Sequence, residues 1–498
     1  MNVRYLFAVL ISLGLSQGVF ASTHEYLVKL KPEAVQGYSA VFGGRLELVS
    51  QEGSLYKWTT DTQLEHANKQ GLFVQNGWRS MNAGVANFLN RSIEYIQPNF
   101  TIQLTPSPSL MANKDKVLAA LGNEPMGFGT SYADNPAVKA PKKQSTGADP
   151  LLKKAWGIPL SGAEAAWKTL GQGKGIIVAV TDTGVDYNHQ DLINNMWHNP
   201  GEIEGNGKDD DGNGYIDDIV GYDFANNDPF PYDMTTETVQ TLFEGGNPGH
   251  GTHVAGVVGA QMNNGVGTAG VAPQVKIMAM RFITERGQGE TAAAIKAIDY
   301  AVANGAKVIN ASWGGEKGEE DDTALMDAIK RAEKKGVIFV AAAGNGRSNA
   351  DGSHGGYDND NDKKPAVPAS YDISNIVAVA AIDSSEKLAS FSNWGAKTVK
   401  IGAPGVKILS TVPGDRYQDT ILDGDPLGWL LGLLVGEITW DGTSMASPFV
   451  AGALAAVWST DTTQTWEKVR DKILDNAKAA SSLKGKVVTD GRLELRGI

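Results

Sequence analysis

Short runs of mainly apolar residues recur from residue 176 onward, and each has the length of a buried β-strand. They are residues 176–180, 307–311, 337–341 and 376–380. Residues 291–304 and 322–335 lie between such runs and carry apolar positions at helical spacing. Apolar strands that alternate with helices indicate a parallel sheet covered by helices on both faces. We therefore predict an α/β domain over residues 149–498, with its chemistry at the carboxyl ends of the strands.

A different pattern precedes this domain. Residues 25–31 alternate apolar and polar positions as a half-buried strand does, and residues 93–98 have the composition of a second strand, which ends at a proline. We expect a small α+β domain over residues 22–104. Residues 105–148 are rich in Pro, Ser, Ala and Lys without clear periodicity, which is typical of a linker.

The first 21 residues have the features of a secretory signal peptide. Arg4 supplies a positive charge, Leu6 to Leu15 are apolar, and small residues precede a cleavage point after Ala21. A buried N-terminal helix is the alternative. The longest later apolar run, residues 427–435, is interrupted by glycine and falls short of the roughly 18 residues of a membrane span. We expect an exported protein, extracellular or periplasmic, without a membrane anchor.

Composition narrows the possible partners and stabilisers. The 498-residue chain carries a net charge of −12, so nucleic acid and anionic membrane surfaces are poor partners. It contains no cysteine, which excludes disulfides, thiolate metal sites and cysteine nucleophiles. An exported protein without disulfides needs another source of stability, and a bound metal is the obvious candidate.

Three polar motifs fall where the pattern places strand ends and helix starts. Asp182, in Thr-Asp-Thr-Gly, directly follows the strand at 176–180. An ordinary turn Asp is one interpretation. Aspartic proteases also use Asp-Thr-Gly, but they need two such carboxylates, and the sequence has no second Asp-Thr-Gly or Asp-Ser-Gly. We therefore reject that class.

The second motif is His-Gly-Thr-His, from His250 to His253. A zinc protease would have its second His four residues on and a Glu beside the first, and both features are missing. A single general base therefore fits His250 better, with His253 structural.

The third motif places Ser444 at the entry to an apolar helix, where free N–H groups favour the negative charge that its attack would create. An N-cap serine explains Ser444 alone equally well. Asn345, after the strand at 337–341, could donate its amide to that charge, although a turn Asn is the simpler interpretation of Asn345 alone.

Ser, His and Asp are the attacker, base and orienter of nucleophilic acyl transfer. The order Asp182, His250, Ser444 and their local sequences, together with Ala-Ala-Gly-Asn at 342–345, resemble the subtilisin-like serine protease (subtilase) family over residues 149–493. The resemblance implies a serine endopeptidase that acts on proteins or peptides. It makes these three residues the catalytic triad, and Asn345 with the Ser444 N–H the oxyanion hole.

The same resemblance implies how substrate and precursor are handled. The substrate backbone would pair with Ser312, Trp313 and Gly314. The specificity pocket would be walled by these three residues together with Ala342, Ala343 and Gly344. Trp313 would give that pocket an apolar rim. Residues 22–104 resemble the family's inhibitory propeptide, the enzyme's own intramolecular inhibitor; an unrelated accessory domain is the alternative. About 45 residues separate it from the protease domain, so we expect the maturation cut somewhere within about 100–150.

An acidic stretch fits the opening of an EF-hand-type calcium loop. Its candidate ligands are Asp209, Asp211, Asn213, Tyr215 through its carbonyl, and Asp217. Val220 replaces the usual bidentate Glu, with Asp218 or Asp223 as substitutes. We expect a structural Ca²⁺; a solvated acidic loop is the alternative. Residues 358–362 form a weaker acidic run without the glycine.

Two insertions lengthen the domain, residues 197–243 and residues 415–440. The second carries the apolar run 427–435, which would rim the cleft or touch the propeptide, or form a locally buried hairpin.

Two other functions compete with a monomeric protease: a catalytically dead binding protein on the same fold, and a calcium-dependent adhesion protein. The complete set of Asp182, His250, Ser444 and Asn345 argues against both.

Overall fold

The computed structural model describes residues 23–31, 45–60, 92–121, 137–141, 146–236, 238–318, 322–348, 354–421 and 437–498. The chain forms two compact units that divide between Pro98 and Asn99. The expected signal peptide, residues 1–21, lies outside the described residues.

The first unit contains a four-stranded antiparallel sheet in the order β2-β3-β1-β4. Its strands are β1 (His24–Leu30), β2 (Arg45–Ser50), β3 (Leu55–Thr60) and β4 (Ile93–Pro98). The strands predicted at 25–31 and 93–98 are thus confirmed as β1 and β4. The helices expected for an α+β domain are not tested, because residues 32–44 and 61–91 are outside the described residues.

The second unit is built on a nine-stranded sheet in the order β20-β21-β17-β16-β12-β10-β6-β8-β7. All neighbours are parallel except β20 and β21, which confirms the predicted α/β fold. The strands are β6 (Ile177–Asp182), β7 (Gly221–Asp223), β8 (Lys276–Arg281), β10 (Val308–Ala311), β12 (Ile338–Ala342), β16 (Ile376–Ile382), β17 (Val399–Pro404), β20 (Lys478–Ala479) and β21 (Gly491–Arg492). The four predicted apolar runs are β6, β10, β12 and β16.

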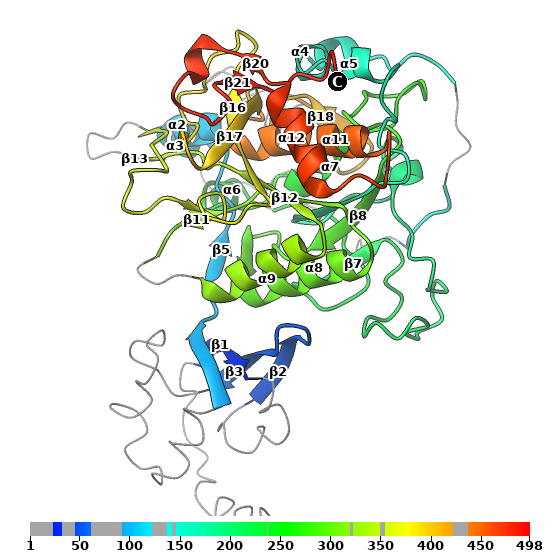
Figure 1. Ribbon diagram of the computed structural model, residues 1–498, viewed down its shortest axis with the longest axis vertical. Coiled ribbons are helices and arrows are strands. Elements are labelled where there is room, and N and C mark those ends of the chain that lie inside the picture. Colours follow the sequence, from blue (N-terminus) through cyan, green and yellow to red (C-terminus); the bar gives the residue numbers. More distant parts are fainter. Residues whose placement is uncertain are drawn as a thin grey trace, which may run out of the picture. The chain divides into compact units, whose positions relative to one another are not determined.

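Helices cover both faces of this sheet (Figure 1). α7 (His250–Gly259) and α11 (Thr443–Trp458) pack together on one face, and α8 (Thr291–Ala303) and α9 (Thr323–Lys334) pack together on the other. α8 and α9 match the predicted helices, and Asp322 caps α9 by accepting the Leu325 N–H (3.1 Å). α11 is buried along its whole length, because its side chains are apolar or small all round.

Shorter elements complete the second unit. The helices are α4 (Gly157–Leu160), α5 (Ala163–Ala166), α6 (Val239–Phe243) and α12 (Trp466–Asp475), with 3₁₀ turns at Leu152–Lys154, Ile193–Asn195 and Ser481–Leu483. The two-stranded pairs are β5 (Thr101–Gln103) with β9 (Gln288–Glu290), β11 (Gly315–Glu316) with β15 (Ala366–Val367), β13 (Arg347–Ser348) with β14 (His354–Gly355), and β18 (Ser410–Val412) with β19 (Arg416–Gln418).

The structure differs from the predicted linker at residues 105–121. These residues contain α2 (Pro108–Ala112) and α3 (Lys114–Leu121), and Leu110 and Val117 are buried in the core of the second unit. Leu110 lies in α2 and Val117 in α3, so each short helix supplies one buried side chain to this core, a signal that the surrounding Pro and Ser residues hide in the composition.

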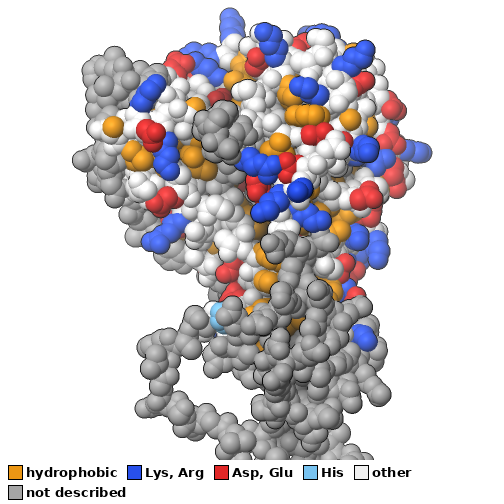
Figure 2. Space-filling view, turned by 90° about the vertical axis from the view of Figure 1, so that its left-hand side faces the viewer, with side chains coloured by type: hydrophobic (Ala, Val, Ile, Leu, Met, Phe, Trp, Pro, Cys, Tyr) orange, Lys and Arg blue, Asp and Glu red, His pale blue; other side chains and the backbone are white. Residues whose placement is uncertain are grey.

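Figure 2 shows acidic and basic side chains interspersed over one face of the larger unit, so this face presents no field of a single sign. Within the described part of the chain, no helix combines the length and the apolar character that crossing a membrane requires.

Candidate active site

The central strands of the sheet bring three candidate residues to one edge. β6, β10 and β12 are parallel neighbours, so their carboxyl ends lie side by side. Asp182 is the last residue of β6, Ser312 follows β10, and Asn345 lies three residues after β12. The two helices of one face begin at the other two motifs, with His250 first in α7 and Ser444 second in α11.

Asp182 and His250 form a buried pair. Oδ1 of Asp182 accepts the backbone N–H of Thr183 (2.8 Å) and lies 2.7 Å from His250 Nδ1. Because a carboxylate only accepts hydrogen bonds, Nδ1 is the donor and Nε2 keeps its lone pair. The imidazole is therefore held in the tautomer that can take a proton through Nε2.

Reciprocal hydrogen bonds fix Ser444 to the end of β10. Its hydroxyl donates to the Ser312 carbonyl (2.8 Å), and the Ser312 hydroxyl donates to the Ser444 carbonyl (2.8 Å). The second bond is possible because Pro448 has no N–H and leaves that carbonyl free of a helical partner. The side chain at the start of α11 is thus positioned by the sheet as well as by its own helix.

Asn345 turns its amide nitrogen toward the start of α11. Its Oδ1 accepts the N–H and the hydroxyl of Thr443 (2.8 Å each), which fixes the orientation of the amide. A methyl group on Gly442 would lie 3.4 Å from Asn345 Nδ2 and 3.5 Å from the Ser444 backbone N. Two N–H donors therefore converge on the space beside Gly442, which is the arrangement that stabilises an oxyanion. His250, Ser444 and Asn345 line one cavity.

A second cavity beside Ser444 contains most of the predicted substrate residues. It encloses about 520 Å³ of empty space, open to solvent. Its lining includes Ser312, Trp313, Gly314, Ala342 and Gly344. Ala343 is instead buried in a separate apolar cluster, because neighbouring residues at the end of a strand face opposite ways.

Trp313, which we expected to give the pocket an apolar rim, lines this cavity but is largely packed into the core. It is 4% exposed, its ring packs edge-on against Phe282 and Phe339, and its Nε1 donates to Thr181 Oγ1 (3.2 Å). A Trp that can bury its ring among aromatics and still satisfy its N–H favours the core.

Among the lining residues that sequence reasoning missed are three with large polar side chains. Glu316 comes from β11 and forms an ion pair with Arg347 (3.1 Å), and Tyr357 lies under the Arg347 guanidinium, 4.2 Å from ring centre to Cζ. Asn393 is the third. Glu316 stands two residues after Gly314 and could have been found from that spacing. The other two come from distant loops, and no local pattern marks them.

A preceding segment of the same chain lies along the cleft. β5 pairs antiparallel with β9, and the Leu104 N–H donates to the Gly287 carbonyl (2.6 Å). Leu104 and Thr105 line both cavities beside Ser444. Residues 101–104 thus form an extended segment held by backbone hydrogen bonds to residues 287–290, and this segment leads Thr105 to the cavities beside Ser444.

The described flanks of the 415–440 insertion contact this segment. The hydroxyls of Ser107 and Ser109 donate to the Thr439 carbonyl (2.8 and 2.9 Å). Ile421 and Trp440 line the cavity that contains Ser444. The base of the insertion thus rims the cleft, while its apolar run lies outside the described residues.

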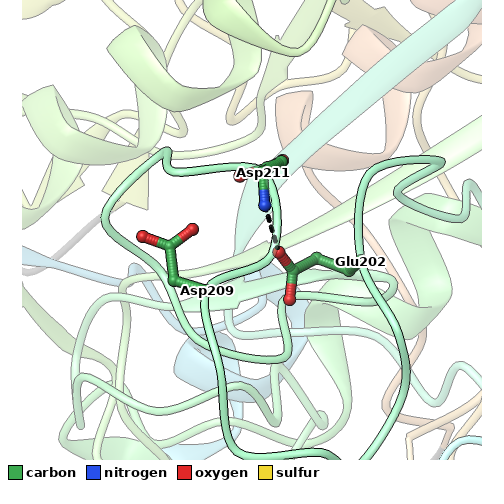
Figure 3. Close-up of side chains that lie close together, drawn as sticks. All are labelled: Glu202, Asp209 and Asp211. Carbon is green, nitrogen blue, oxygen red and sulfur yellow. Dashed lines mark hydrogen bonds between the residues drawn. The ribbon is translucent and has the colours of Figure 1, made fainter.

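The acidic loop brings together two of its predicted ligands and one unexpected residue. Carboxylate oxygens of Glu202, Asp209 and Asp211 lie within 4.8 Å of one another. Figure 3 shows the Asp211 backbone N–H donating to Glu202 (3.1 Å). Carboxylate oxygens are the ligands that Ca²⁺ prefers, so this set fits such an ion. Glu202 was missed because it stands seven residues before the motif.

The side chains of the other predicted ligands make contacts within and beside the loop, and these contacts do not test a ligand role for Asn213 or for the Tyr215 carbonyl. Asp217 accepts the N–H groups of residues 206 and 207 (3.1 and 2.9 Å), and Asn213 Nδ2 donates to Asp211 and Asp218 (3.1 and 3.0 Å). The Tyr215 ring packs on Tyr222, Phe224 and Tyr300. Asp218 and Asp223 were the suggested substitutes for the missing Glu. Asp218 accepts a hydrogen bond from the Tyr300 hydroxyl, and burial raises the pKa of Asp218. Asp223 forms an ion pair with Arg281 (2.5 Å).

His253 has a structural environment. It is fully buried, stacks on Trp440 at 4.3 Å, and its Nε2 lies 2.9 Å from the Ile408 carbonyl. Burial lowers the pKa of His253 to about 3, so it is neutral at ordinary pH.

Comparison with known proteins identifies what the chain resembles. The profile described as "Subtilase family" matches residues 173–491. The chain is 36% identical over 313 residues to a thermophilic serine proteinase of Bacillus sp. (strain AK1). The aligned region covers 62% of this chain and 59% of that relative. It is 33% identical over 322 residues to subtilisin DY of Bacillus licheniformis (65% of this chain, 90% of the relative). It is 35% identical over 290 residues to thermitase of Thermoactinomyces vulgaris (58% of this chain, 77% of the relative).

Proposed function

The chain belongs to the subtilase family of serine endopeptidases, and on this premise we propose that it hydrolyses peptide bonds with Ser444 as the nucleophile. Ser444 Oγ attacks the scissile carbonyl, and His250 Nε2 takes the hydroxyl proton and returns it to the leaving amine. Asp182 orients the imidazole through Nδ1. Asn345 Nδ2 and the Ser444 N–H stabilise the oxyanion. In the second half, His250 Nε2 takes a proton from water, the water oxygen attacks the acyl carbon, and the bond to Ser444 Oγ breaks as His250 returns the proton to Oγ.

One observation carries this proposal above the others: the 2.7 Å bond between Asp182 and His250 lies beside a cavity that His250 shares with Ser444 and Asn345. A calcium-dependent adhesion protein would need none of these contacts.

A serine-directed covalent probe tests the function. We expect a fluorophosphonate to label the mature wild-type protein, and Ser444→Ala to abolish labelling. Ser447→Ala is the matched control, since Ser447 lies on the next turn of the same helix and is fully buried. Labelling of Ser444→Ala at the wild-type level, or no labelling of the wild type, would contradict the proposal.

We further propose that the protein is made as an exported precursor which cuts itself. Residues 1–21 would act as a signal peptide and residues 22–104 as an inhibitory propeptide, and the mature enzyme would act on proteins or peptides as a monomer, outside the cell or in the periplasm. The position of Leu104 and Thr105 beside Ser444 supports this, because that segment blocks the cleft until it is cut. Intact mass of the same wild-type and Ser444→Ala proteins reports self-cutting directly.

We propose that Ca²⁺ bound by Glu202, Asp209 and Asp211 stabilises the fold without taking part in the reaction. Clustered carboxylates repel one another unless a cation neutralises them. The ion would tie Glu202 to the turn at residues 209–211 and so close the loop of residues 199–218 on itself.

Removing calcium should lower the melting temperature. An ion present at 100 times its Kd stabilises the folded state by about 2.7 kcal/mol. We expect chelation to destabilise the Ser444→Ala protein, which cannot digest itself, and Glu202→Gln with Asp209→Asn to remove most of that difference. Asp210→Asn is the control, since Asp210 bonds to Ile203 and Asn206 on the same loop. A calcium effect that survives the double substitution would exclude this site.

A further inference from the structure

Asp233 lies behind the candidate site although it comes from the 197–243 insertion. It is fully buried. The backbone before it is packed against the loop after β6: Val185 N–H donates to the Pro231 carbonyl (2.9 Å), and a side chain on Gly184 would meet that carbonyl at 2.7 Å. The insertion thus delivers a carboxylate to the protein interior close to Asp182.

Asp233 accepts four hydrogen bonds from residues that flank the Asp182–His250 pair. Oδ1 accepts the Thr183 hydroxyl (2.8 Å) and Asn247 Nδ2 (2.6 Å). Oδ2 accepts the Thr252 N–H (2.8 Å) and the Thr252 hydroxyl (2.6 Å). Thr183 follows Asp182 directly, and Asn247 and Thr252 lie on either side of His250. One side chain therefore ties the end of β6 to the start of α7.

The same network satisfies the N-terminal N–H groups of α7. The cap residue, Gly249, has no side chain to accept them. Instead Asn247 Oδ1 accepts the His250 N–H (2.7 Å), the Thr183 hydroxyl oxygen accepts the Gly251 N–H (2.9 Å), and Asp233 accepts the Thr252 N–H. The first turn of the helix that carries His250 is thus held by acceptors that Asp233 organises.

The direction of each hydrogen bond requires an acceptor with no hydrogen at position 233. Asn247 cannot flip, because its Oδ1 accepts two backbone N–H groups, of Gly249 (2.8 Å) and His250. The Thr252 hydroxyl accepts the Asp186 N–H (2.9 Å), so it must donate to Asp233. If Asn replaced Asp233, its amide nitrogen would point at a hydrogen-bond donor in either orientation of the side chain. Only a carboxylate satisfies all four partners.

We propose that Asp233 is a positioning residue for catalysis, which fixes His250 relative to Asp182 by tying α7 to the end of β6. This inference rests on the proposed function, since it assigns His250 the role of base. Asp233 acts through Thr183, Asn247 and Thr252, and we assign it no contact with substrate. Burial raises the pKa of Asp233, whereas the four hydrogen bonds that it accepts favour the charged form and lower the pKa, and the result is a pKa of about 6. Asp233 is therefore a carboxylate at neutral pH.

The decisive variant is Asp233→Asn. A displacement of about 1 Å at the reacting groups costs about 100-fold in rate. We therefore expect kcat to fall about 10- to 100-fold while KM changes about twofold or less. Thr252→Val, which loses one hydroxyl, should show a smaller fall, and Thr252→Ser, which keeps it, should restore the wild-type value.

Asp223→Asn is the matched control. Asp223 is an equally buried carboxylate of the same insertion, but it pairs with Arg281. Both variants lose stability, and only Asp233→Asn should lose kcat at a temperature where both are folded. An equal fall in kcat for both, or a Thr252→Val rate equal to that of Thr252→Ser, would overturn the proposal.

A measurement on the uncut chain separates this inference from the proposed function. In full-length Ser444→Ala, the proton between His250 Nδ1 and Asp182 should give a resolved low-field NMR resonance, and adding Asp233→Asn should shift or broaden it. An unchanged resonance refutes the positioning role even if the enzyme is active. Failure of the fluorophosphonate to label wild-type Ser444 refutes the proposed function and leaves this resonance test interpretable.

Discussion

Replacing Asp182 by Asn should lower kcat by about 10⁴-fold, the largest effect we expect from a change outside Ser444 and His250. The Asp182 carboxylate accepts from His250 Nδ1 and so leaves Nε2 free to take a proton. An amide can present its nitrogen to the ring, which then puts its hydrogen on Nε2, and it carries no charge to stabilise the imidazolium. Steady-state hydrolysis of a peptide substrate measures the loss.

Asp186→Asn is the control for this substitution. Asp186 is also buried on the loop after β6, but it accepts the N–H groups of Asn188 (3.1 Å) and Gly414 (2.8 Å). Its replacement should leave kcat near the wild-type value. An Asp182→Asn enzyme that retained more than about one hundredth of wild-type kcat would contradict the assigned role.

Loss of the oxyanion site should give the second largest effect. Asn345→Ala removes one donor and should lower kcat by about 10²- to 10³-fold. Gly442→Ala keeps both donors, but its methyl group would lie 3.4 Å from Asn345 Nδ2 and 3.5 Å from the Ser444 N, in the space where the oxyanion must form. We expect both variants to lose kcat with little change in KM, as measured on one peptide series.

The two variants test the site independently. Asn345→Ala also takes an acceptor from Thr443, whereas Gly442→Ala removes no hydrogen-bonding group and instead adds a methyl group, with backbone strain, at a residue of φ +156°. A Gly442→Ala enzyme with full turnover would show that the oxyanion forms elsewhere, whatever Asn345→Ala does. A peptide aldehyde forms an adduct that is a charged mimic of the intermediate. If a variant bound this aldehyde as tightly as the wild type does, or more tightly, that result would contradict the assignment in the same way.

The sequence predicts the α/β sheet well because its central strands are apolar throughout. β6, β10, β12 and β16 are buried on both faces, so apolar runs alone locate them. The elements it misses are mixed in composition. α2 and α3 contribute Leu110 and Val117 to the core, but the Pro and Ser residues in and before α2 look like those of a linker.

The site is predictable where its residues stand in local motifs. Asp182, His250 and Ser444 each sit in such a motif, but nothing in those motifs shows that Ser312 and Pro448 fix the first turn of α11. Glu202 and Asp233 stand outside every motif. Their roles depend on the path of the 197–243 insertion, which no spacing rule supplies.

The burial of Leu110 and Val117 decides where an independently stable catalytic unit begins. Each side chain contributes about 1.5–3 kcal/mol when it is withdrawn from water. A recombinant protein that starts at residue 149 lacks both and exposes the apolar surface that they cover, which favours self-association and speeds irreversible inactivation. A maturation cut before residue 106 leaves these two side chains on the enzyme, and a cut after residue 121 detaches them from it. We therefore expect the position of the proposed maturation cut to set the working lifetime of the enzyme.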